Sequence, residues 1–184
     1  MIGIVRTVTA LALVAAMLGF PTRPAAAASA GELQSAGRAS LQSLYRATPS
    51  AKLLASKAKA ILVFPKMVKA GFMFGGQIGE GVCFQGKKTT GYYNSVAASY
   101  GLQAGVQKFG YALFFMNNDA VRQLDATRGF ELGVGPSFVL VDEGKGRSLT
   151  TNTLTSDVYA FIFDQKGLMA GIGIQGSKIT RIDK

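Results

Sequence analysis

The sequence predicts an α+β fold in which N-terminal amphipathic helices precede a strongly bent, glycine-rich, mainly antiparallel, barrel-like sheet with one inserted helix. Three observations carry this prediction. Helical spacing of apolar residues comes first, between residues 31 and 60. Glycine-punctuated apolar segments follow and indicate close approaches of bent strands. Turn sequences separate the later apolar runs, and helices followed by strands are the order of an α+β fold.

The first 28 residues predict a secretory signal peptide. Arg6 precedes an apolar run at residues 8–20, and prolines and an alanine tract come next. A retained membrane anchor is the alternative, but a spanning helix needs roughly 20 apolar residues. Small-residue patterns allow cleavage after Ala27, Ala28 or Ala30. We therefore expect an exported protein of the periplasm or cell envelope, with a single domain over residues 29–184.

Two helices are expected next. Residues 31–48 place leucines at helical spacing, and Pro49 ends this segment. Ser50 is a candidate N-cap for a second helix over residues 51–60. Lys52 and Lys59, seven residues apart, would share one face of that helix, whereas Lys57 is rotated from them by about 140°. A basic face of this kind suits a membrane interface, and it equally suits a solvated helix packed on the domain.

The strands are expected to begin with residues 61–64, an apolar run stopped by Pro65 and followed by a connection with Lys66 and Lys69. Glycine-rich strands are expected at 71–81 and 99–107, and segments 129–138 and 168–176 have the same texture. Because no helix is expected directly after these glycines, they do not predict a phosphate-binding loop.

The rest of the chain reads as turns, short strands and one helix. Lys87 and Lys88 lie in an expected turn, and a helix should run from an Asn117 or Asn118 cap to Thr127. Strands are expected at residues 137–141, 158–163 and 168–182, turns at 142–146 and 164–167, and a polar loop at 150–156.

Composition argues against an enzyme. The chain has no histidine, which removes the commonest general base and most transition-metal sites. Its single cysteine, Cys83, excludes an internal disulfide and lies in an apolar stretch that predicts a buried, inert thiol. No pair of carboxylates is persuasive, since Asp142 and Glu143 are adjacent turn residues and the acids of the inserted helix read as surface charge. We expect no catalytic residues, no metal and no cofactor.

Charge is distributed unevenly. Removal of residues 1–28 leaves 18 basic and ten acidic residues, a net charge of +8. Between Leu33 and Asn118 there are ten basic residues and one acid, Glu80, for which we expect a structural contact to backbone amides or a lysine. Residues 119–184 are balanced. A field of one sign favours a polyanionic partner, which outside the cytoplasm means an envelope polymer or lipid rather than nucleic acid. The alternative is that the charge serves solubility alone.

Five blocks in order carry a resemblance to a known family. They are Ala-Ile-Leu-Val-Phe-Pro-Lys (60–66), Gly-Gly-Gln-Ile-Gly-Glu-Gly (75–81), Gly-Tyr-Tyr-Asn (91–94), Ser-Tyr-Gly-Leu-Gln-Ala-Gly (99–105) and Lys-Gly-Leu-Met-Ala-Gly (166–171). Together they resemble the SYLF lipid-binding domain family, bacterial members of which are exported.

This resemblance implies phospholipid binding through a basic N-terminal helical region, here residues 50–69, and some members of the family also bind actin. We therefore expect peripheral binding of anionic membrane lipid in the bacterial envelope. The alternative is an envelope protein-interaction or scaffold module that uses the glycine-rich sheet surface. The predicted lipid-binding residues are Lys52, Lys57, Lys59, Lys66, Lys69, Arg38 and Arg46.

Overall fold

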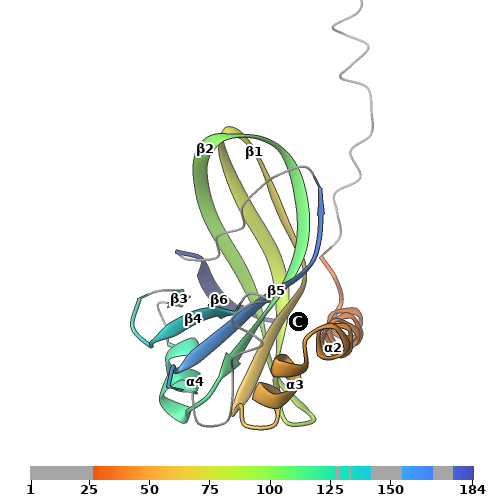
Figure 1. Cartoon of the computed structure of the whole chain (residues 1–184), viewed down its shortest axis with the longest axis vertical. Coiled ribbons are helices and arrows are strands. Elements are labelled where there is room, and N and C mark those ends of the chain that lie inside the picture. The colour runs from red at the N-terminus through yellow and green to blue at the C-terminus, as the bar shows by residue number, and fades with distance from the viewer. Residues whose placement is uncertain (1–26, 127–128, 133, 142–154, 168–175) are drawn as a thin grey trace, which may run out of the picture.

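The computed structural model describes residues 27–126, 129–132, 134–141, 155–167 and 176–184, with the backbone alone described at 72–74, 99–104 and 167. The predicted signal peptide, residues 1–28, therefore lies almost wholly outside the described residues. Figure 1 shows helices beside one end of a long, curled pair of strands.

Helix α2, Ala30–Ala47, confirms the first predicted helix. Ser29 caps it: the Ser29 hydroxyl accepts from the Glu32 amide, and the Glu32 carboxylate accepts from the Ser29 amide. The buried face of α2 comprises Leu33, Gly37, Leu41 and Leu44. Within the described chain, no helix combines the length and apolar character needed to cross a membrane.

Helix α3, Pro49–Ala55, is shorter than predicted. Proline occupies its first position, where no amide donor is required, and the helix ends well before residue 60. The Ser56 hydroxyl donates to the Leu53 carbonyl, and the Lys59 amide donates to the Phe115 carbonyl, so the chain has already joined the sheet. The predicted helix over 51–60 is therefore wrong in its second half.

Strands β1, Ala60–Gln85, and β2, Lys88–Phe115, form one antiparallel hairpin. Its register runs from Ala60 opposite Phe115 to Gln85 opposite Lys88, and Gly86 takes a φ of 59° in the turn. The predicted turn at Lys87 is confirmed.

Pro65 does not end the strand, contrary to the prediction. It lies at an irregularity of pairing between Phe64 and Met67, where its missing amide breaks no regular ladder bond. Lys66 and Lys69 consequently lie within β1 rather than in a connection.

The hairpin folds back on itself near residues 71–75. A Cβ on Gly75 would lie 2.5 Å from the Ala70 carbonyl oxygen, and one on Gly81 would lie 2.6 Å from the Phe64 ring. The two halves of β1 therefore approach as closely as only glycine permits. We call the folded region with the pairs next to it, residues 70–79 and 95–106, the tip. The hairpin turn and both outer ends of the hairpin lie at the other end, the helical end (Figure 1).

The remaining strands extend this curled sheet. They are β3 (Phe130–Glu131), β4 (Phe138–Val141), β5 (Val158–Gly167) and β6 (Lys178–Ile182), and the order is β3-β6-β2-β5-β4, with β1 also paired to β2. Only β4 and β5 pair in parallel. The bent, mainly antiparallel α+β fold is confirmed, with α4, Asn118–Leu124, as the inserted helix capped by Asn117.

One predicted turn is wrong. Residues 164–167 continue β5, because a bulge between Lys108 and Gly110 of β2 absorbs the irregularity at Asp164, whose φ is 52°. The turn predicted at 142–146, most of the polar loop at 150–156 and most of the 168–176 segment lie outside the described residues.

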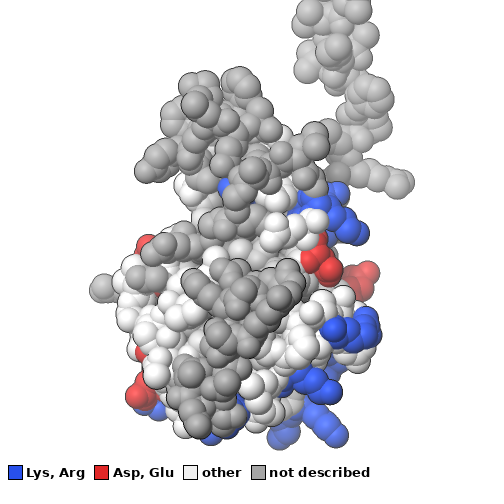
Figure 2. Space-filling model, viewed as in Figure 1, with Lys and Arg blue, Asp and Glu red and all other residues white. Residues whose placement is uncertain are grey.

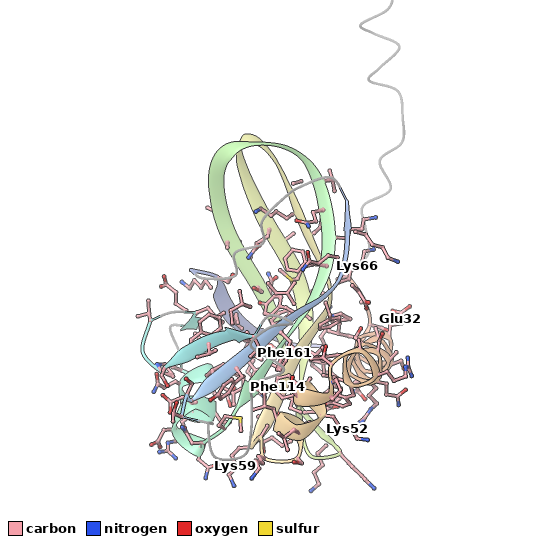
Figure 3. All side chains as sticks on the ribbon, viewed as in Figure 1. Glu32, Lys52, Lys59, Lys66, Phe114 and Phe161 are labelled. Carbon is pink, nitrogen blue, oxygen red and sulfur yellow. The ribbon has the colours of Figure 1, made fainter. Side chains whose placement is uncertain are left out.

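Two apolar layers hold the fold together. The interior of the curled sheet is filled by Phe64, Met67, Phe109, Tyr111 and their neighbours. Outside the sheet, α2 and α3 cover a second layer, in which Phe114 and Phe161 meet edge to face with 5.2 Å between ring centroids (Figure 3). Helices α2 and α3 therefore cover the outer face of the sheet at the helical end (Figure 1).

Gly75→Ala tests the fold-back. The added Cβ would meet backbone atoms that cannot rotate away, so we expect a loss of about 1–3 kcal/mol in the free energy of unfolding, measured by urea denaturation. Gly76→Ala is the matched control, because its Cβ would meet only the Ala97 carbonyl oxygen at 3.4 Å. Equal stability of the two variants would contradict the proposed packing constraint.

Candidate functional site

The predicted lipid-binding residues do not form one compact patch. Lys52 and Lys59 lie at the helical end, whereas Lys66 lies farther toward the tip, on the side of Glu32 (Figure 3). Six of the seven predicted side chains are exposed. The seventh, Lys69, is only 7% exposed. Residues 50–69 therefore supply cations to different parts of the molecule.

A cluster of exposed cations forms at the helical end for a reason that differs from the predicted one. Lys52 and Lys59 do not share a helix face, since α3 ends at Ala55. Instead, the fold-back carries Lys87 of the hairpin turn and Lys88, the first residue of β2, to the end where β1 begins. Sequence reasoning placed these two lysines in a turn but missed them as site residues.

Arg38 joins α2 to that turn. Its guanidinium donates to the Lys87 carbonyl at 3.0 Å and lies 4.7 Å above the centre of the Phe84 ring. We name the cluster the basic end: Arg38, Lys52, Lys57, Lys59, Lys87 and Lys88, all exposed. Arg46, in the last turn of α2, is exposed as well.

No carboxylate from the segment between Leu33 and Asn118 neutralises the basic end. Glu80, the one acid between Leu33 and Asn118, accepts from the Lys184 ammonium through both oxygens at 2.9 Å. Lys184 also donates to the Ala28 carbonyl at 2.7 Å. Glu80 thus has the structural role predicted for it. Figure 2 shows basic side chains along the lower right edge with no acidic side chain among them.

Lys69 belongs to the sheet interior. It lies opposite Gln107 in the hairpin register, and both side chains are buried. Nearby positions of the interior are polar too: Gln77 donates to Ser177 at 2.9 Å, and Tyr111 donates to Ser95 at 2.6 Å. The interior is therefore aromatic toward the helical end and polar toward the tip.

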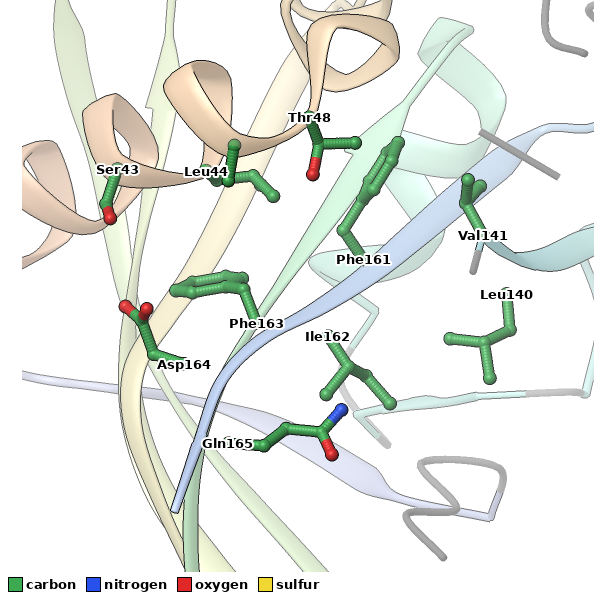
Figure 4. A pocket seen from close by; sticks show the side chains of 11 residues that line it. Ser43, Leu44, Thr48, Leu140, Val141, Phe161, Ile162, Phe163, Asp164 and Gln165 are labelled. Carbon is green, nitrogen blue, oxygen red and sulfur yellow. The ribbon is translucent and has the colours of Figure 1, made fainter. Parts of the chain in front are cut away.

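A cleft of about 590 Å³ lies between the C-terminal half of α2 and strands β4 and β5 (Figure 4). Leu44, Val141, Phe161 and Phe163 give it an apolar floor. Its polar lining residues are Ser43, Thr48, Asp164 and Gln165. Among the described lining residues, Asp164 is the one carboxylate.

The remaining reactive groups have structural environments. Burial raises the pKa of the Cys83 thiol to about 11, so it stays protonated at neutral pH, and its predicted burial is confirmed. Tyr93 donates to Asp125 at 2.5 Å, and the Arg181 guanidinium donates to the same carboxylate oxygen at 2.7 Å. This network joins α4 to β2 and β6. Sequence reasoning missed it because its members are far apart in the chain.

The described residues contain no group of three potential metal-ligating side chains. Asp142 and Glu143, the adjacent acids weighed as a catalytic pair, lie outside them. The described surface thus offers two features, the basic end and the apolar cleft.

Residues 96–184 match the family model described as "Ysc84: Las17-binding protein actin regulator". This part of the chain is similar to the Ysc84 (SYLF) family, a family of binding domains, and the match confirms the resemblance found in the sequence. A search of curated proteins found no match to the chain. All seven predicted lipid-binding residues lie before residue 96, so the match does not bear on them.

Cys83 should be inert in the folded protein. Because its thiol is buried and its pKa is raised, we expect a disulfide-exchange reagent at pH 8 to react far more slowly with the native protein than with protein unfolded in guanidinium. Absorbance of the released thiolate reports both rates. Comparable rates would place the thiol at the surface.

The Glu80–Lys184 pair should contribute to stability. The side chains are 29% and 9% exposed, so we expect a coupling energy of about 1–3 kcal/mol in a cycle of Glu80→Gln, Lys184→Gln and the double variant. Urea denaturation measures each corner. Additive effects would show that the contact adds no stability.

Proposed function

We propose that the protein binds anionic phospholipid peripherally and that the basic end is its contact surface. One observation carries the proposal: six exposed cations of α2, α3, the α3–β1 connection and the hairpin turn gather at one end, and the one acid in their part of the sequence is paired with Lys184. Supporting arguments are the family of binding domains and the predicted export, which would place the chain beside envelope lipids.

The strength of this contact follows from its electrostatics. Each Lys or Arg near an anionic lipid surface is worth roughly 1 kcal/mol, so several together hold a protein reversibly. Such binding weakens as salt rises, because the screening length falls to about 10 Å at 0.1 M ionic strength. The basic end has the features of this reversible mode, since its charges are exposed rather than buried in a cavity.

A protein partner is the second candidate function. The family description names a protein-binding actin regulator, and the outer face of the sheet near the tip exposes Ile78 and Val96. Under this proposal the chain is an envelope interaction module, and neutralising the basic end leaves its affinity for the partner protein unchanged.

Lys57→Gln/Lys59→Gln tests the lipid proposal. We expect affinity for vesicles containing phosphatidylglycerol or cardiolipin to fall roughly thirtyfold at low salt, since two surface cations are lost. Co-sedimentation over a lipid titration measures the change, and salt should weaken binding of the unaltered protein.

Arg122→Gln is the control, and it is compared with Lys59→Gln alone. It removes one charge from an exposed position on α4, outside the basic end. We expect a change of less than about threefold from the loss of long-range attraction alone, against roughly fivefold for Lys59→Gln. Equal losses in these two single variants, or equal binding to neutral vesicles, would refute the basic end as the contact surface.

A further inference from the structure

The outer face of the sheet near the tip carries exposed apolar side chains. Ile78 is 55% exposed, Val96 47% and Val106 54%. Ile78 lies directly opposite Val96 in the hairpin register, and Val106 lies opposite the exposed Ala70. Helix α2 covers the outer face farther down, where Gly37 meets Val63, Val82 and Phe84. The helices therefore stop short of these residues.

The sequence of the tip is uncharged. No Asp, Glu, Lys or Arg occurs at residues 70–79 or 95–106, although charged residues make up 16% of the chain. Gly76 and Ala98, also opposite each other, are exposed and continue the apolar face. At the bend, Phe72 takes the register position opposite Ala104, and Phe74 the position opposite Tyr100. The described apolar side chains of this region, Ile78, Val96 and Val106, are exposed at positions where solvated proteins usually place charges.

Lysines surround the base of the tip. Lys108 of β2 and Lys166 of β5 are exposed and directly opposite each other. Like charges in directly opposed positions destabilise a sheet, so this pair does not serve the fold. Lys66 of β1 is exposed on the tip side of Lys52 (Figure 3). Asp164 is the acid beside this group on β5, and Glu32 and Glu80 line a cleft together with Lys66. Because Lys184 pairs with Glu80, four cations face three acids and the set remains positive.

We propose that the tip inserts into the interfacial region of an anionic bilayer. Ile78, Val96 and Val106 enter the boundary of the acyl chains, and the ammonium groups of Lys66, Lys108 and Lys166 meet lipid phosphates. This arrangement of an apolar end above a positive collar matches the layering of a bilayer surface. The inference rests on anionic lipid as the ligand of the proposed function, but it uses the end of the molecule opposite the basic end, so a molecule whose tip is inserted holds its basic end away from that bilayer (Figure 1).

Charge complementarity favours a lipid surface over a second copy of the chain. Two copies that met through their tips would bring two lysine collars together, and like charges across an interface oppose association. An anionic bilayer neutralises the same collar. Self-association remains an outcome of the experiment below.

Because the chain has no tryptophan, a single introduced tryptophan reports the depth of its own position in a bilayer. Ile78→Trp and Val106→Trp place one indole at exposed tip positions, and Val134→Trp, at a residue 62% exposed between β3 and β4, is the matched control. With phosphatidylglycerol vesicles, we expect emission of the two tip variants to shift to shorter wavelength. Lipids brominated on the acyl chain should quench it several-fold more than in Val134→Trp.

Three results would overturn the inference. If the protein sediments with anionic vesicles but the tip indoles show no shift or quenching, the tip inference fails and the lipid proposal stands. If no variant sediments, both fail. If the shift appears without vesicles and grows with protein concentration, a second copy covers the tip instead.

A second pair of variants ties insertion to the collar and the apolar face. In the Val106→Trp protein, Lys108→Gln/Lys166→Gln should reduce acyl-chain quenching several-fold, and Ile78→Ser should do the same. Both changes fall at exposed positions, so circular dichroism should match that of the parent. In contrast, Lys57→Gln/Lys59→Gln should lower the bound fraction without reducing the quenching of the protein that remains bound, because the molecules that remain bound contact the bilayer through the tip. Quenching unaffected by the collar and Ile78 variants would refute the proposed contact.

Discussion

The close approach of the two halves of β1 is the constraint on which the rest of the structure depends. Gly75, Gly79 and Gly81 meet the backbone or ring of residues 64–71, where any side chain would hold the halves apart. Because the hairpin folds at this point, its turn and its outer ends lie at one end of the molecule, and its bend projects at the other. The interior layer, the surface under α2 and the basic end all follow from this one packing contact.

The fold separates chemical properties along the length of the sheet. Toward the helical end, aromatic side chains fill the interior and cations cover the surface. Toward the tip the pattern reverses, with polar groups such as Gln77 and Ser95 inside and aliphatic groups outside. The sheet therefore has two chemically different outer surfaces, a basic one at the helical end and an apolar one near the tip. Among the described residues, neither surface contains a pair of catalytic groups.

Local sequence patterns correctly predicted the elements that depend on local interactions. The first helix, the Asn117 cap, the turn at Lys87 and the bent glycine-rich sheet follow from spacing, capping and glycine content. The errors arose where tertiary contacts override local signals. Pro65 is accommodated at a pairing irregularity, and that shift directs Lys69 inward, which alternation alone does not reveal. The cations of the basic end come together only through the fold-back, and Glu80 finds Lys184 across 104 residues.

The nested register of the β1–β2 hairpin also has a kinetic meaning. Pairs beside Gly86 close loops of a few residues, whereas the Ala60–Phe115 pair encloses the whole hairpin. The entropy lost on closing a loop grows with its length, so each pair formed next to the turn lowers the cost of the one beyond it. Zipping from the turn therefore offers the least costly route to a ladder of this length, and it reaches the bend only after the strands on the turn side are already paired.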